Sequence, residues 1–81
     1  MSTRIAAVWT AYRERVVPED ASRIQIQETR RAFYAGATAL MALLLAHLDP
    51  GSEATADDLR MMDELDAELK RFAADIAEGR A

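Results

Sequence analysis

Arg30 and Arg31 are the residues whose types and spacing come closest to a chemical site. With Gln25, Gln27 and Glu28 they form the densest polar set of an otherwise amphipathic segment. Guanidinium groups bind carboxylates in paired hydrogen bonds, so a small helical enzyme could hold a carboxylate substrate here. No glycine-rich phosphate loop, nucleophile elbow or metal motif accompanies the set. Solvated side chains and salt-bridge partners are therefore the favoured interpretation, with the enzyme as an alternative.

His47 is the only histidine, and the chain has no cysteine. One imidazole alone builds neither a familiar zinc site nor a nucleophile–base pair. Carboxylates at Asp57, Asp58 and residues 63–68 could in principle hold magnesium. However, the first two suit a helix start, and most of the others fall on an outer helix face. We therefore expect no catalytic, cofactor-binding or metal site, and a protein that is not an enzyme.

Helices are predicted to position all of these residues. The chain has 81 residues with only three glycines and two prolines, and alanine, leucine, glutamate and arginine dominate it. We predict an all-α fold in a single helical domain, residues 1–81, with helices over about 3–16, 19–48 and 56–78. A short first helix precedes a long antiparallel helical hairpin made of the other two.

Caps and breakers set these boundaries. Pro18 ends the first helix by holding Val17 extended, and it is predicted to serve as the first residue of the second. Glu19 and Asp20 then suit the positive end of that second helix. The segment 49–52 stops it.

The third helix has a start signal and a stop signal. Residues 55–58 (TADD) resemble a capping box, and Gly79 can terminate the helix. Asp66 and Lys70 are expected to form an exposed pair four residues apart.

The first helix is expected to fold back on the start of the second. It places Trp9 and Tyr12 near Ile24 and Ile26. Its apolar residues recur at helical spacing and predict one buried face: Ile5, Val8, Trp9, Tyr12 and Val16.

A short connection makes the second and third helices antiparallel neighbours. The register predicted from the loop pairs Phe33 with Phe72 and Leu40 with Leu65, and brings Arg30 or Arg31 within reach of Asp75. The third helix supplies a stripe stepping by three and four residues, as in coiled coils. The predicted hairpin core is Phe33, Ala37, Leu40, Leu44, Met62, Leu65, Leu69, Phe72 and Ile76.

The end of the second helix has a second apolar face. Residues 35–48 are apolar almost all round, and the third helix can cover only one side. Met41, Ala42, Leu45 and Leu48 are therefore predicted to be a self-association interface. Two hairpins packed in this way form a helical bundle, and closed two-fold dimers are the commonest arrangement.

A membrane span through residues 32–48 is a less favoured alternative. The stretch has 17 largely apolar residues, the lower limit for a span, but it contains Thr38 and His47 and precedes an amphipathic helix that matches it. The opening residues have no apolar run of signal-peptide length, so we expect a cytoplasmic protein.

Charge is divided unevenly along the chain. Residues 1–48 carry six arginines against four acids, and residues 49–81 carry ten acids against four basic residues. A net charge of −4 disfavours nucleic-acid binding. A further alternative is that the acidic third helix imitates phosphate charge, as a decoy of a nucleic-acid-binding protein.

Three segments carry a family resemblance: residues 9–13 (WTAYR), 17–21 (VPEDA) and 25–37 (QIQETRRAFYAGA). In them the chain resembles small uncharacterised helical proteins encoded by bacteriophages and prophages of proteobacteria. The resemblance implies a phage origin, a bacterial host cytoplasm and an accessory or host-interaction role, and it brings no catalytic residues. We expect a phage-type helical protein–protein interaction module, homodimeric, whose further partner is a host or phage protein.

Overall fold

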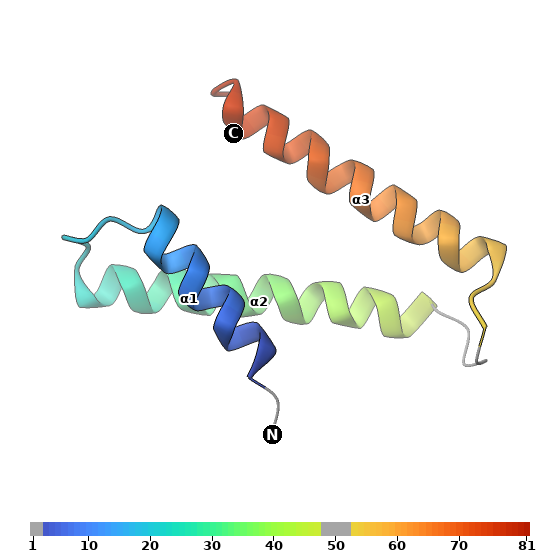
Figure 1. The fold of residues 1–81 in the computed structure, drawn as a ribbon, viewed down its shortest axis with the longest axis horizontal. Helices are drawn as coiled ribbons and strands as arrows, with labels where there is room; N and C mark the ends of the chain where they lie inside the picture. The colour runs from blue at the N-terminus through green and yellow to red at the C-terminus, as the bar shows by residue number, and fades with distance from the viewer. Residues whose placement is uncertain (1–2, 48–52) are drawn as a thin grey trace. The chain divides into compact units, whose positions relative to one another are not determined.

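The computed structural model describes residues 3–47 and 53–81. Within these ranges it contains three α-helices and no strand: α1 (Arg4–Val16), α2 (Arg23–His47) and α3 (Ala56–Ala77) (Figure 1). The prediction of an all-helical fold is confirmed. The chain divides into two compact units, Met1–Leu44 and Leu45–Ala81.

The end of α1 follows from Pro18. Val17 has φ −81° and ψ 127°, which is extended backbone, and its N–H donates to the Arg13 carbonyl at 3.1 Å. Proline disfavours helical geometry in the residue before it because its ring collides with that residue's backbone. The predicted break at Val17 and Pro18 is therefore confirmed.

The start of α2 differs from the prediction. Pro18 is not its first residue, because its carbonyl accepts from the Ala21 N–H at 3.1 Å and so closes a turn that contains Glu19 and Asp20. The helix begins at Arg23, where Ser22 Oγ accepts from the Gln25 N–H at 3.0 Å. A serine three residues before a glutamine is a capping-box pattern. The Ser22 side chain provides a cap that Pro18 cannot provide, so residues 19–22 belong to the connection between α1 and α2.

Three aromatic rings form the contact between α1 and α2 in the first unit. The Trp9 and Phe33 ring centroids are 5.5 Å apart, Tyr12 and Phe33 5.4 Å, and Trp9 and Tyr12 6.1 Å. These spacings are typical of favourable aromatic pairs. Trp9 is 6% exposed, and it is the only hydrophobic residue classed as buried among the described residues.

The rest of the predicted α1 face is not buried. Ile5, Val8 and Val16 are exposed, and so is Ile24 at 72%. Ile26 is half-buried. Ile24 and Ile26 lie about 200° apart around a helix, so they cannot share one contact face. The prediction that both isoleucines lie near Trp9 and Tyr12 is therefore wrong for Ile24, and Phe33 is the residue that meets the two rings.

The start of α3 confirms the predicted capping box. Thr55 Oγ1 accepts from the Asp58 N–H at 3.1 Å, and the Asp58 carboxylate accepts from the Thr55 N–H at 3.2 Å. Two backbone donors at the helix N-terminus are thus satisfied by neighbouring side chains. Asp58 is buried at this start, where its carboxylate completes the cap.

The end of α3 confirms the role predicted for Gly79. Gly79 has φ +78°, a left-handed conformation that glycine adopts without a steric penalty. Its N–H donates to the Ile76 carbonyl at 3.1 Å, and the Arg80 N–H donates to the Asp75 carbonyl at 2.8 Å. This pair of hydrogen bonds is a Schellman motif, and it satisfies carbonyls that the end of a helix leaves open.

Candidate functional site

Arg30 and Arg31 each contact a side chain of their own helix, α2. Arg31 Nη1 lies 3.2 Å from Glu28 Oε1, and both side chains are well exposed. The Arg30 guanidinium lies 5.2 Å from the centroid of the Tyr34 ring. Exposed ion pairs contribute about 0–1 kcal/mol, and a cation over an aromatic ring contributes about as much. A shallow hollow of about 290 Å³ joins Arg30, Arg31 and Tyr34 but does not include Glu28.

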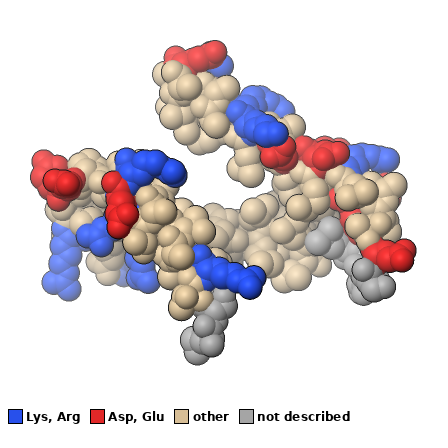
Figure 2. Space-filling model, in the orientation of Figure 1, with Lys and Arg blue, Asp and Glu red and all other residues tan. Residues whose placement is uncertain are grey.

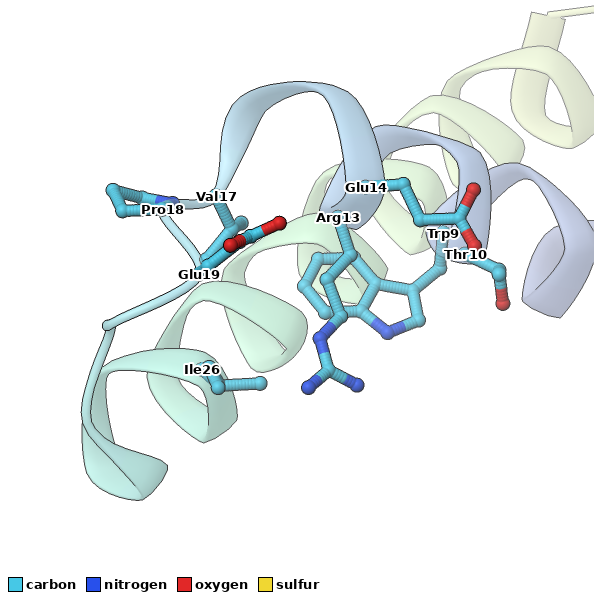
Figure 3. A pocket seen from close by; sticks show the side chains of 8 residues that line it. All are labelled: Trp9, Thr10, Arg13, Glu14, Val17, Pro18, Glu19 and Ile26. Atoms are coloured by element: carbon cyan, nitrogen blue, oxygen red, sulfur yellow. The ribbon is translucent and has the colours of Figure 1, made fainter.

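A larger hollow lies where α1 turns into α2, and sequence reasoning missed it (Figure 3). Its volume is about 460 Å³, and it brings together side chains of both helices and the turn: Trp9, Thr10, Arg13, Glu14, Val17, Pro18, Glu19 and Ile26. Trp9, Val17, Pro18 and Ile26 contribute apolar side chains to its lining, and charges of both signs lie beside them. The sequence signal that could have indicated this hollow is Trp9 followed one helical turn later by Arg13.

Two carboxylates of α3 form ion pairs with basic side chains one turn along the helix. Asp66 Oδ2 lies 2.7 Å from Lys70 Nζ and Asp57 Oδ1 lies 3.5 Å from Arg60 Nη1. The hydrogen bond and the charge of Asp66 raise the pKa of Lys70 above its usual value. Within residues 3–47 and 53–81, no three His, Asp or Glu side chains are grouped so that they could hold a metal ion.

The C-terminal half of α2 presents apolar side chains to solvent. Leu45 is 74% exposed and Met41 53% exposed, and Ala42 is exposed beside them. Leu48, the fourth residue of the predicted interface, lies outside the described residues. No helix in the described part of the chain is long and apolar enough to cross a membrane.

Helix α3 carries a second exposed apolar stripe, which we call the α3 seam. Four of its members are exposed and Leu65 is half-buried. The seam consists of Met62, Leu65, Leu69, Phe72 and Ile76. A hollow of about 290 Å³ opens on it between Leu69 and Phe72, and it is also lined by Glu68, Arg71 and Asp75.

The predicted hairpin pairs join residues of the two units, and they stay predictions. In the first unit, Phe33 contacts Trp9 and Tyr12 of α1. In the second, the cation beside Asp75 is Arg80, whose Nη2 lies 2.7 Å from Asp75 Oδ1.

Comparison with known proteins gives no relative: no family model, curated protein or solved structure matches the chain. The candidate site therefore rests on geometry. Its most extensive features are the exposed apolar face of α2 and the α3 seam, and such faces are typical of protein interaction surfaces.

Proposed function

We propose that this chain is a helical protein–protein interaction module without enzymatic activity, and that it forms a homodimer through the C-terminal half of α2. The observation that supports the proposal is the exposure of Met41 and Leu45, together with Ala42, on a half-helix that has no Asp, Glu, Lys or Arg from Ala32 to His47. Alanine at position 42 would allow a second helix to approach closely.

Free energy favours covering this face. Fully burying a leucine or methionine side chain contributes about 1.5–3 kcal/mol. A domain of this size has a total stability of only about 5–15 kcal/mol or less, so uncovered residues of this kind matter. A second copy is the commonest way to cover such a stripe, because two-fold dimers use the same patch on both chains.

The α2–α3 hairpin is part of the same proposal. Its register pairs Phe33 with Phe72 and Leu40 with Leu65, and two such hairpins form a four-helix bundle. The apolar face of α2 and the α3 seam would then both be covered within one assembly.

The phage resemblance supplies the biological part of the proposal. Residues 9–13, 17–21 and 25–37 support an accessory protein of phage origin in a bacterial cytoplasm, with a host or phage protein as its partner.

Sedimentation equilibrium at micromolar concentration tests the homodimer. The unmodified protein should sediment as a dimer. Leu45→Glu should sediment as a monomer or unfold, since a carboxylate in the contact would lose its hydration without a partner.

Ala39→Glu is the matched control. It adds the same carboxylate to α2 about 120° around the helix from Leu45, and it should leave the dimer intact. A well-folded monomer of the unmodified protein, or an equal effect of both variants, would reject the proposed interface.

A further inference from the structure

The edges of the α3 seam carry acidic side chains. In a stripe that steps by three and four residues, the positions flanking the seam set the choice of partner helix by their charge. On α3 these positions are Asp66 and Ala73 along one edge, and Met61, Glu68 and Asp75 along the other. None of these five positions is a lysine or arginine. Figure 2 shows that α3 as a whole carries both acidic and basic side chains, with uncharged surface between them.

The hollow on the seam combines an aromatic wall with two of these carboxylates. Leu69 and Phe72 line it, with Glu68 and Asp75 beside them and Arg71 as its one cation. A long basic side chain can lay its methylene groups on such a wall and hold its charged end at the carboxylates. One of these carboxylates already binds a guanidinium group, since Arg80 Nη2 lies 2.7 Å and Nε 3.2 Å from Asp75 Oδ1.

The charge pattern also discriminates among the possible occupants. A second α3 would set acidic edges against acidic edges, which is unfavourable. The α2 residues from Ala32 to His47 match the seam in apolarity, but they have no Lys or Arg to place beside Glu68. A basic amphipathic helix satisfies both the seam and its edges.

We propose that the α3 seam is a docking site for a basic amphipathic helix of another protein, with an arginine or lysine of that helix seated between Leu69 and Phe72. This goes beyond the homodimer, because it uses a different helix face and a different partner. Where the proposed α2–α3 hairpin forms, the basic helix would compete with α2 for the seam.

Binding of two synthetic 21-residue helices to the full-length protein tests this inference. Both helices have leucine along the seam positions, and one has arginine and the other glutamate at the flanking positions. Titration calorimetry should show that the arginine helix binds at least about tenfold more tightly, with an affinity that falls as salt is raised.

A matched pair of variants locates the contact on α3. Glu68→Lys should weaken binding of the arginine helix roughly five- to tenfold, since an attraction becomes a repulsion at the edge of the seam. Glu64→Lys makes the same change on the outer face of α3 and should have little effect. Circular dichroism checks that both variants keep their helix content.

Three results would overturn the inference: binding of neither helix, equal binding of both, or equal weakening by the two variants. The first would mean that α2 holds the seam against other partners. None of these results bears on the homodimer, because the Leu45→Glu comparison is read without any added helix.

Discussion

The first unit and α3 of the second are both helical, but different interactions hold them. In the first unit, Trp9, Tyr12 and Phe33 join two helices through their rings. In the second, the capping box at Thr55 and the turn at Gly79 close the ends of a helix whose seam is exposed. The first unit is therefore organised by tertiary packing and α3 by local signals.

Removing the Trp9 side chain should have the largest effect on stability. Trp9→Ala is expected to lower the free energy of unfolding by about 3–5 kcal/mol, because it deletes the buried side chain that joins α1 to α2. Urea unfolding followed by circular dichroism at fixed protein concentration measures the change.

The neighbouring Val8→Ala is the control, since Val8 is 59% exposed on the same helix. We expect it to cost less than about 1 kcal/mol. Equal losses for the two variants would show that the ring cluster does not organise the first unit.

Removing a helix cap should have the next largest effect on stability. Thr55→Ala is expected to cost about 1 kcal/mol, because it leaves the Asp58 N–H at the start of α3 without its side-chain acceptor. Ser22→Ala removes the corresponding acceptor from α2.

The two cap variants differ in how much other structure holds the helix. Helix α2 is also held to α1 by the ring cluster through Phe33. We therefore expect Thr55→Ala to reduce helicity, measured by circular dichroism, more than Ser22→Ala does. The reverse order would mean that α3 depends less on local signals than α2 does.

The features that were predictable from the sequence are the local ones. The break at Pro18, the capping box at Thr55 and the stop at Gly79 were predictable because each depends on residues within one turn. The start of α2 was missed although Ser22 and Gln25 show the pattern, because Pro18 offered a competing signal.

The packing partners were harder to predict. Periodicity shows which residues share a helix face, but it does not show which other face covers them. The pattern pairs Phe33 with Phe72, which stays a prediction, and it does not indicate the contacts of Phe33 with Trp9 and Tyr12. The hollow beside Trp9 was missed for the same reason, since three separate segments form it.

Two glycines should respond to alanine with opposite signs. Gly79→Ala is expected to destabilise α3 by about 1 kcal/mol, because alanine is strained at φ +78°. Gly36→Ala should stabilise α2 by about 0.5–1 kcal/mol, since a Cβ there meets no atom within 4 Å and alanine favours a helix.

Thermal unfolding at fixed concentration measures both glycine variants. A destabilising Gly36→Ala would show that another helix approaches α2 closely at this position, and it would place the dimer contact nearer to Gly36 than proposed.

The smallest effect is expected at the exposed pair of Asp66 and Lys70 on α3. The pKa of Lys70 is raised, first by its hydrogen bond to Asp66 and then by the charge of that carboxylate. A raised pKa in the folded state means that the pair stabilises α3 below the ordinary lysine pKa and that the contribution disappears as pH rises through the folded value. Lys70→Gln should therefore lower helicity slightly at neutral pH and not at all at a pH above that value. Because the pair is exposed, high salt should abolish the difference as well.

NMR titration of the Lys70 side chain checks the direction of the pKa shift. The pKa of Lys70 should be higher in the unmodified protein than in Asp66→Asn. An equal or lower pKa would show that the pair does not form in solution, and the local stabilisation of α3 would then rest on its two ends.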